Sequence, residues 1–389
     1  MPETLKLMYF ADHSDVGGYQ EVFRLWLEHM DFSRFSVRVV ILYGHGMYEE
    51  KYRELGAEVI SLSGSKYNPF IPARMAAEIR CFKPDILHCN LVVSTCLGPL
   101  LGRRLGVPAI MASLHSARPL RGFYRLLKPL YAHGCGICDT MIPVSLTGRD
   151  YLVEELGVEL EKTEILPNTF NPSIADAPED SRKKLCDRFG ISEDAFIVVA
   201  TGTLIWYKGH ADLIRAISKL MRNNKKIYLL IVGKGKLETE LRRLIAKLGL
   251  EEQVRLLGYL KHRSESFPDY ASVLKAADAF VLSSYFEGFP LSALEAMWAE
   301  KPVVATKVSG IIDHFCDGED IVMSEVGNAD RLAEALDRML SMGTEARATM
   351  AAKARRLVGE NFSPQKVCLR LENIYERILM RNLKDSEET

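Results

Sequence analysis

The sequence has no long apolar run and almost no net charge. Its 389 residues carry 50 Lys and Arg against 51 Asp and Glu, a formal net charge of -1. No global field therefore recruits nucleic acid or a membrane, so any electrostatic targeting must be local. No apolar stretch approaches membrane-spanning length, and the one near the N-terminus is too short for a signal peptide. We expect a cytoplasmic protein with no nucleic-acid partner.

Patterns that bind metals or form disulfides are also scarce. Eight cysteines in a cytosolic chain of this size favour reduced thiols. Cys135 and Cys138 have the spacing of metal ligands, but zinc would need a second such pair. A redox dithiol would open a helix after a strand, whereas this pair closes a helical segment ahead of an apolar run. We interpret the pair as packing residues.

Short apolar runs alternate with helical segments in two successive halves of the chain. The length exceeds that of a usual single core, so we predict two domains. Such alternation predicts parallel sheets with helices on both faces, which bind ligands at the carboxyl ends of their strands. The predicted strands are 5–12, 37–44, 57–63, 85–90, 109–115, 139–145 and 163–168, then 195–202, 227–233, 254–258, 279–284 and 302–306.

The domain boundaries follow from composition. The segment 171–181, with Pro and small polar residues, reads as a linker. We therefore predict an N-terminal domain over 1–170 and a C-terminal domain over 182–363. The remainder, 364–389, is expected to be a last helix to residue 380 and an acidic tail too polar to be ordered.

The most informative stretch runs from residue 283 to 310. A predicted strand ends there in a loop, and apolar residues recur at helical spacing from Pro290. A helix start supplies free N–H donors in a positive end field that suits a phosphate, and Pro290 loses nothing by lacking its own N–H. The candidate donors are the backbone N–H groups of Gly288, Phe289, Leu291 and Ser292. Glu287 and Glu295 flank this site, and carboxylates accept hydrogen bonds from sugar and ribose hydroxyls. The layout fits a nucleotide diphosphate sugar.

The run Glu287-Gly-Phe-Pro-x4-Glu295, followed by KPVVAT at 301–306, resembles the signature of retaining glycosyltransferases of family 4, which have the GT-B fold. The resemblance covers almost the whole chain. It implies an α/β protein with two Rossmann-like, doubly wound parallel-sheet domains that face each other across a cleft. The N-terminal domain would bind the acceptor and the C-terminal domain the donor, and the final helix would cross back to the first domain.

A second motif, Gly202-Thr-Leu-x3-Lys208-Gly209, resembles the strand-loop-Lys-Gly motif of the family. A lysine at a helix start, beside exposed N–H donors, is well placed to neutralise a diphosphate. Thr203 stands where many members have an arginine that pairs with this lysine on the diphosphate. The strength of the phosphate clamp is therefore in doubt, although Lys208 and the helix start at Pro290 remain.

Two further turns belong to the predicted donor domain. Gly233-Lys-Gly235 is half of a dinucleotide fingerprint and lacks the third glycine, which indicates a close-approach turn and no NAD site. The segment 257–260 resembles the base-recognition edge of the family, where main-chain groups near Leu260 would face the nucleobase.

The predicted N-terminal domain contributes two candidate features. Gly17-Gly18 lies at a strand-to-helix turn, where glycine allows positive φ and close approach of a ligand, though a plain turn would look the same. A lone histidine at a strand end, such as His115, is more often a structural hydrogen-bonder than a catalyst. The resemblance implies that His115 lies close to the donor sugar and that the glycine loop faces the donor.

Residues 118–133 form a predicted amphipathic helix with a basic stripe. The stripe consists of Arg118, Arg121, Arg125 and Lys128. It is either a solvated basic face or a docking face for an anionic acceptor or lipid headgroups, which would place the protein at the inner face of the cytoplasmic membrane.

No two aspartates are two positions apart, so the DxD metal motif of the other large glycosyltransferase fold is absent. We predict a metal-independent enzyme without a cofactor, with His115, Lys208 and Glu287 as catalytic residues. The expected reaction moves a hexose-type sugar from a UDP-sugar, or a GDP-sugar, to a hydroxyl of a cell-envelope polysaccharide or lipid-linked glycan, with retention. The alternatives are another GT-B enzyme, such as a nucleotide-sugar epimerase, and a nucleotide-sugar-binding protein without turnover.

Overall fold

The computed structural model describes residues 4–15, 17–63, 65, 68–116, 123–222, 226–262, 264 and 267–387. The chain forms two compact units. Unit 1 consists of Met1–Thr169 with Pro364–Thr389, and unit 2 consists of Phe170–Ser363. The segment expected to be a linker, 171–181, clusters with unit 2.

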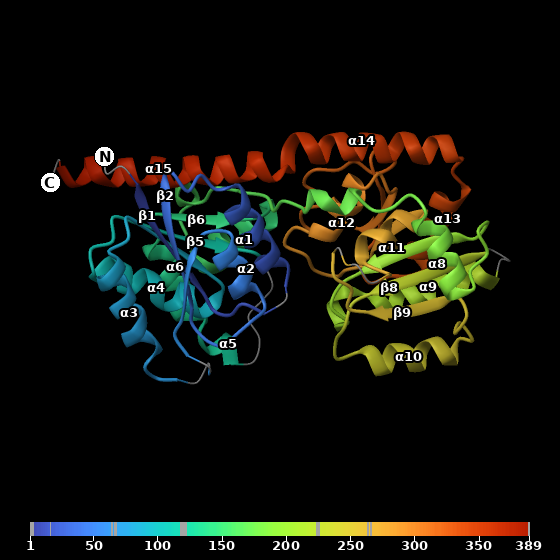
Figure 1. The fold of residues 1–389 in the computed structure, drawn as a ribbon, viewed down its shortest axis with the longest axis horizontal. Coiled ribbons are helices and arrows are strands. Elements are labelled where there is room, and N and C mark those ends of the chain that lie inside the picture. Colours follow the sequence, from blue (N-terminus) through green and yellow to red (C-terminus); the bar gives the residue numbers. More distant parts are fainter. Residues whose placement is uncertain are drawn as a thin grey trace. The chain divides into compact units, whose positions relative to one another are not determined.

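Unit 1 is a six-stranded parallel sheet with helices on both faces (Figure 1). The strand order is β3-β2-β1-β4-β5-β6. The strands are β1 (Leu5–Ala11), β2 (Phe35–Ile41), β3 (Glu58–Ser61), β4 (Ile86–Asn90), β5 (Ala109–Leu114) and β6 (Thr140–Pro143). The helices are α1 (Gly18–His29), α2 (Tyr48–Glu54), α3 (Ile71–Phe82), α4 (Val92–Arg104), α5 (Phe123–Leu126), α6 (Lys128–Ile137), α7 (Leu146–Asp150) and α15 (Pro364–Glu387), with short turns at Tyr151–Glu155 and Leu160–Lys162.

Unit 2 repeats this topology, with the strand order β12-β11-β10-β7-β8-β9. Its strands are β7 (Phe196–Thr201), β8 (Ile227–Val232), β9 (Val254–Gly258), β10 (Ala279–Leu282), β11 (Val303–Thr306) and β12 (Val322–Ser324). Its helices are α8 (Ser181–Phe189), α9 (His210–Arg222), α10 (Glu238–Lys247), α11 (Tyr270–Ala276), α12 (Leu291–Trp298), α13 (Ala329–Ser341) and α14 (Thr344–Phe362), with 3-10 turns at Pro172–Ala175 and Trp206–Lys208.

The strands are short apolar runs because both faces of each sheet are covered by helices. In β5 and β10 every residue is buried. The prediction of two parallel α/β sheets is confirmed, but two strand assignments were wrong. Residues 163–168 form only an isolated bridge, between Thr163 and Met141, and β12 was not predicted.

Three other expectations need correction or comment. The expected single helix over 118–133 is two helices, α5 and α6, and residues 117–122 lie outside the described part. The last helix runs to Glu387, through most of the tail that was expected to be unordered. All eight cysteines are free thiols, as predicted, and burial raises the pKa of Cys135 to about 12, which keeps it protonated and unreactive.

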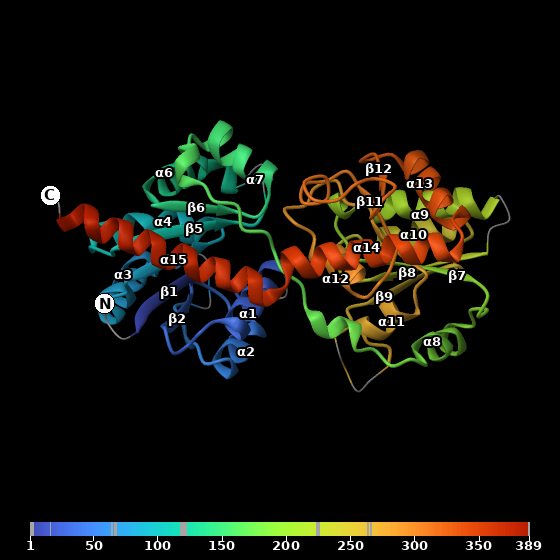
Figure 2. The same cartoon turned by 90° about the horizontal axis from the view of Figure 1, so that it is seen from above.

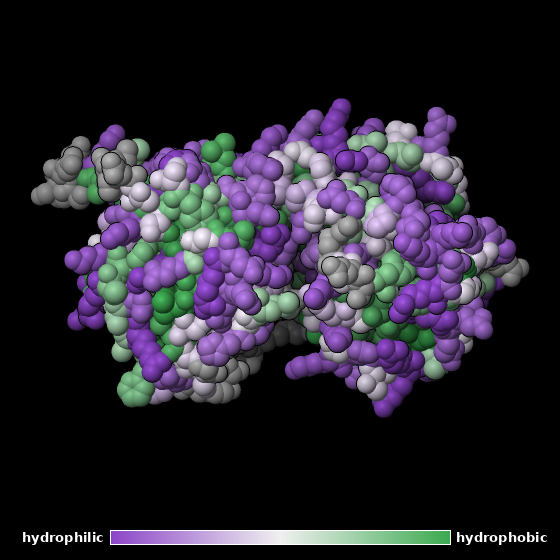
Figure 3. Space-filling model, in the orientation of Figure 1, coloured by the Kyte–Doolittle hydropathy of each residue, from purple (hydrophilic) through white to green (hydrophobic). Residues whose placement is uncertain are grey.

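The face of the molecule in Figure 3 is largely hydrophilic, with apolar side chains scattered among polar ones. Within the described ranges, no helix combines the length and the apolar character needed to cross a bilayer.

Helix α15 lies against α1 and β5 in unit 1 (Figure 2). The Tyr375 hydroxyl is 2.7 Å from His88 Nδ1 and also bonds the Tyr9 hydroxyl, while His88 Nε2 is 2.7 Å from Ser113 Oγ. All four side chains are buried. Burial lowers the pKa of His88 to about 3, so the imidazole is neutral and one chain of hydrogen bonds fastens the last helix to the sheet.

Tyr375→Phe should keep the packing of α15 but leave buried polar atoms of Tyr9 and His88 without their partner. We expect the free energy of unfolding to fall by about 1–3 kcal/mol. Urea unfolding followed by tryptophan fluorescence measures this, because Trp26 packs against His88 with ring centroids 6.0 Å apart. Tyr228→Phe, at a half-buried tyrosine of unit 2, is the control and should change stability by less than about 0.5 kcal/mol. Equal effects of the two substitutions would contradict the fastening role.

Candidate active site

Two loops of unit 2 meet where the strand order of its sheet reverses. The reversal lies between β7 and β10, because the chain adds β8 and β9 on one side and β11 and β12 on the other. Ligands of open parallel α/β sheets bind outside the carboxyl ends of the strands at this point. The loop after β7 carries Lys208, and the loop after β10 carries Glu287. The topology thus brings together two predicted site residues that are 79 positions apart in sequence.

Lys208 and Glu287 form an ion pair. Lys208 Nζ is 2.6 Å from Glu287 Oε1, and the two side chains are 21% and 10% exposed. Ser284 Oγ donates to the same Glu287 oxygen at 2.6 Å. A hydrogen-bonded pair with restricted solvent access is held in a defined geometry, unlike an exposed pair. The cation expected to meet a diphosphate is therefore already oriented, and its partner is the carboxylate expected to meet the sugar.

Glycines allow the two loops to cross in close contact. Gly209 has φ +66°, and a Cβ there would lie 1.9 Å from the Ser283 carbonyl oxygen. Ser283 Oγ in turn donates to the Lys208 carbonyl at 2.9 Å. A Cβ on Gly202 would meet the Lys208 side chain at 3.5 Å. These contacts with the two loops fix the position of Lys208.

The turn at Gly233 and Gly235 approaches the protein's own backbone. A Cβ on Gly233 would lie 2.0 Å from the Gly202 carbonyl oxygen, and one on Gly235 would lie 2.4 Å from that of Leu204. Both glycines therefore support the Lys208 loop. Thr203, at the position of the missing arginine, is exposed.

Helix α12 begins at Leu291, directly after this crossing. Pro290 precedes it without a side-chain cap, and the Pro290 carbonyl accepts from Ala293 at 3.2 Å. Among the described residues, no acceptor pairs with the backbone N–H of Leu291 or Ser292. The Phe289 side chain is 3% exposed and packs on Phe362, so Phe289 can contribute only its backbone to a ligand. Gly288 is buried beside it.

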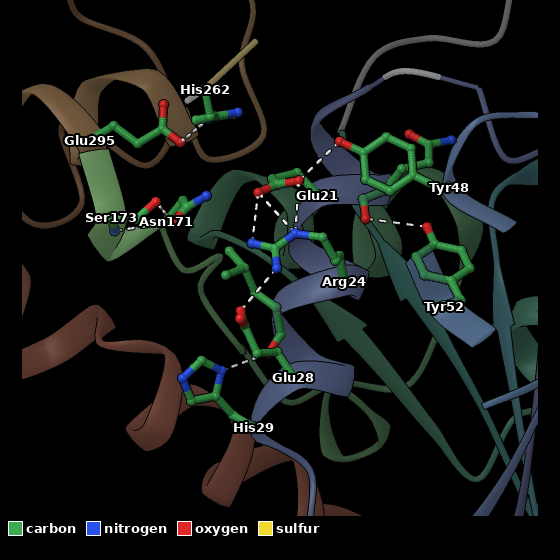
Figure 4. Close-up of polar contacts among 12 residues, drawn as sticks. Glu21, Arg24, Glu28, His29, Tyr48, Tyr52, Asn171, Ser173, His262 and Glu295 are labelled. Carbon is green, nitrogen blue, oxygen red and sulfur yellow. Dashed lines mark hydrogen bonds and ion pairs between the residues drawn. The ribbon is translucent and has the colours of Figure 1, made fainter. Parts of the chain in front are cut away.

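Glu295 lies on α12 and is 4% exposed. Its Oε1 is 2.9 Å from His262 Nε2, as Figure 4 shows. Leu260 is half-buried, two residues before His262, near the start of the loop that follows β9. A buried carboxylate needs partners, and His262 supplies one. The histidine was missed because it is 33 positions away from Glu295 and belongs to no motif.

In unit 1 the corresponding point, between β1 and β4, is occupied by the protein itself. Asp12 follows β1 and is 3% exposed. It accepts from the backbone N–H of Val93 at 2.9 Å and of Ser94 at 2.7 Å, at the start of α4. Burial raises the pKa of Asp12 in spite of these two hydrogen bonds. The start of α4 is therefore closed to an external anion.

His115 follows β5 and packs against Tyr19 of α1, with ring centroids 4.6 Å apart. Its Nε2 is 3.2 Å from Asn90 Oδ1, an acceptor, so the proton lies on Nε2. Nδ1 is buried and, within the described residues, has no hydrogen-bond partner. Burial lowers the pKa of His115 to about 3. The histidine is neutral near pH 7 and can orient a hydroxyl but does not supply a positive charge.

The glycine loop of unit 1 has an extended conformation. Gly17 has φ -173°, which any residue adopts, and Gly18 is the first residue of α1. The positive φ that this glycine pair allows is therefore not used. Helix α1 itself is held by Glu21, which pairs with Arg24 at 2.9 Å and accepts from the Tyr48 hydroxyl at 2.9 Å (Figure 4).

The expected basic stripe is only partly described, because Arg118 and Arg121 lie outside the described residues. Arg125 is exposed on α5, and Lys128 lies at the start of α6, where it pairs with Glu155 at 2.9 Å. The two cations belong to different helices, so they do not form the stripe of one helix.

No cluster of three or more His, Cys, Asp or Glu side chains that could hold a metal ion is found within the described part of the chain. The candidate site consists of the Lys208 cation, the carboxylates of Glu287 and Glu295, and the start of α12.

Comparison with known proteins identifies the family of the chain. The model of glycosyl transferases group 1 matches residues 181–357, and that of glycosyltransferase family 4 matches residues 16–174. The chain therefore belongs to the family 4 (group 1) glycosyltransferases.

Curated relatives match over most of their length. The alpha-D-kanosaminyltransferase of Streptomyces kanamyceticus is 26% identical over 302 residues, which cover 75% of this chain and 76% of the relative. The UDP-Gal:alpha-D-GlcNAc-diphosphoundecaprenol alpha-1,3-galactosyltransferase of Escherichia coli is 26% identical over 275 residues, 66% of each chain. The structure of Anabaena HepE in complex with UDP-glucose is similar with a TM-score of 0.83 and 18% identity, covering 96% of this chain and 100% of the other. This likeness shows the GT-B fold.

Gly209→Ala should test how tightly the two loops cross. A left-handed alanine costs about 1–2 kcal/mol, and forcing the loops apart adds about 1–3 kcal/mol. Gly190→Ala is the matched control, since Gly190 has nearly the same φ, +65°, but no atom within 4 Å of the added Cβ. Thermal unfolding should show a larger loss of stability for Gly209→Ala. Equal losses would mean that the backbone conformation matters and the loop contact does not.

Proposed function

We propose that this protein is a retaining glycosyltransferase that moves a hexose-type sugar from a UDP-sugar to a hydroxyl of a cell-envelope polysaccharide or lipid-linked glycan. The observation that carries the proposal is the Lys208–Glu287 pair, 2.6 Å apart, at the reversal point of the unit 2 sheet and beside the open start of α12. At this point a cation, a carboxylate that can accept hydrogen bonds from hydroxyl groups, and unpaired N–H donors lie together. A sugar diphosphate needs all three.

The proposed roles follow from the charges. Departure of the nucleotide leaves negative charge on the phosphate while the anomeric carbon gains oxocarbenium character. Lys208 and the N–H groups of Leu291 and Ser292 stabilise that charge. Glu287 holds sugar hydroxyls and Glu295 the ribose.

In the proposed same-face mechanism the leaving phosphate takes the acceptor's proton, so no protein base is needed and the sugar keeps its anomeric configuration. His115, being neutral, orients the donor sugar. We propose that the reaction needs no metal ion, because Lys208 and the helix start supply the positive potential.

Similar proteins favour a UDP-linked donor. The E. coli relative is a UDP-Gal transferase that acts on a diphosphoundecaprenol-linked sugar, and the HepE structure contains UDP-glucose. The first of these also supports a lipid-linked acceptor. We further propose that the protein works at the inner face of the cytoplasmic membrane, where exposed Arg125 would contribute to contact with anionic headgroups.

Two other functions remain distinguishable by experiment. An epimerase would convert the donor with no acceptor present. A binding protein would hold the donor tightly and leave it intact with every acceptor tried, and exposed Thr203, in place of an arginine, is the one feature that favours it.

The first prediction from the proposed function concerns the nucleotide. Thermal unfolding is measured with UDP, GDP, ADP and CDP, each near saturation. UDP at about 100 times its dissociation constant should stabilise the folded protein by roughly 2.7 kcal/mol, and Glu295→Ala should abolish the shift. If no nucleotide shifts the midpoint, unit 2 is not a nucleotide site and the proposal fails.

The second prediction separates chemistry from binding. Glu287→Ala should lower turnover by about 100- to 1000-fold, measured as release of nucleotide from the donor sugar, and change affinity for the free nucleotide far less. Glu319→Ala, which removes an exposed carboxylate of the same unit, is the control. The assay is run with a chelator, so a strict requirement for added metal ion would contradict metal independence. Equal loss of turnover and affinity would show that Glu287 is misassigned.

A further inference from the structure

Large aromatic side chains gather on the two loops that carry Lys208 and Glu287. Trp206 lies two residues before Lys208, and Phe286 lies directly before Glu287. Their ring centroids are 5.9 Å apart in an edge-to-face arrangement, and Trp206 meets Tyr285 at 5.8 Å. We name Trp206, Tyr285 and Phe286 the aromatic platform.

The platform is held in place by its backbone and by one hydroxyl. The Tyr285 N–H donates to the Tyr207 carbonyl at 2.7 Å, which joins the two loops. The Tyr285 hydroxyl donates to Asp212 Oδ2 at 2.5 Å, and Asp212 also pairs with Arg215 at 2.8 Å. The hydroxyl is thus committed within the protein. The platform can therefore contact a ligand only through the faces and edges of its rings.

Two members of the platform remain in solvent. Trp206 is 46% exposed and Phe286 is 42% exposed, whereas Phe289, three residues on in the same loop, is 3% exposed. The loop therefore buries one phenylalanine and leaves another outside. Exposed apolar surface costs free energy, and a rigid aromatic pair beside a charged site is typical of a ligand contact.

The platform differs in chemistry from the site that it borders. Lys208, Glu287 and the α12 start are polar and fit the charged and hydroxylated donor. The platform presents apolar rings. A pyranose has one face of C–H groups and a rim of hydroxyls, and that face packs on aromatic rings, which lose little conformational entropy on binding.

We propose that the aromatic platform binds a pyranose ring of the acceptor, next to the donor sugar. The proposal rests on the proposed glycosyltransferase function and adds the class of acceptor: a glycan whose sugar ring lies on Trp206 and Phe286.

Trp206 itself reports on the platform. The chain has three tryptophans, of which Trp26 is 1% exposed and Trp298 is half-buried, so acrylamide should quench mainly Trp206. The full-length chain is saturated with the nucleotide that shifts its unfolding midpoint. Methyl pyranosides of glucose, galactose, mannose and N-acetylglucosamine are then added as probes, with 1-octanol as an apolar probe without a sugar ring.

At least one pyranoside should lower the acrylamide quenching constant about twofold in the natural protein. Phe286→Ala should remove the protection, and Phe70→Ala, at a 67% exposed aromatic of unit 1, should retain it. If Phe286→Ala also loses the nucleotide shift, Phe286→Leu is used in its place, because it keeps the apolar volume without a ring. Phe286→Leu should likewise lose the protection from acrylamide quenching.

The outcomes separate the two proposals. Absence of any nucleotide shift in the natural protein overturns the proposed function, and the acceptor assignment with it. A nucleotide shift without protection by any pyranoside overturns the platform alone, as does protection that survives the loss of the Phe286 ring. Protection by octanol and by no pyranoside would assign the surface to an apolar chain and also overturn the proposal.

Discussion

The ion pair between Lys208 and Glu287 is the contact on which the arrangement of the candidate site in unit 2 depends. It joins the loop after β7 to the loop after β10, with 2.6 Å between Lys208 Nζ and Glu287 Oε1. A carboxylate that is only 10% exposed needs a cation and a hydroxyl to replace lost water, and Lys208 and Ser284 provide them. An arriving diphosphate would have to share Lys208 with Glu287. In the proposed reaction this sharing frees Glu287 oxygens for sugar hydroxyls at the moment the phosphate is bound.

Much of the fold could be predicted because each strand of a covered parallel sheet is a short apolar run. The failures have specific causes. In the segment 163–168, the backbone N–H groups of Glu164 and Leu166 donate to β6. Pro143 of β6 has no N–H to donate in return, so this segment cannot pair with β6 as a seventh strand. Strand β12 has three residues, too few to show a period. The tail read as unordered from its charge continues α15, because a helix already formed extends at little cost.

The candidate site was predictable residue by residue but not as a geometry. Lys208, Glu287 and Glu295 were found because each lies in a local motif. The pairing of Lys208 with Glu287, and of Glu295 with His262, was not found, since these contacts join positions 79 and 33 apart. Glycines mislead in the same way. Gly233 looks like part of a ligand loop, yet the atom that excludes its Cβ is the carbonyl oxygen of Gly202, 2.0 Å from where the Cβ would lie. A glycine in the sequence indicates that another group approaches the backbone closely, but the sequence does not show whether that group belongs to a ligand or to the protein.

The two units share one topology and differ in charge at the point where strand order reverses. In unit 1 the carboxylate of Asp12 fills the start of α4, accepting from Val93 and Ser94. In unit 2 the strand that corresponds to β1 is β7, and it is followed by Gly202 in place of an acidic residue, so the start of α12 keeps its donors. The carboxylate of Asp12 already takes the N–H donors at the start of α4, so an external anion finds none there, whereas the donors at the start of α12 stay open. This difference in residue type at equivalent positions supports the proposal that the nucleotide diphosphate binds to unit 2.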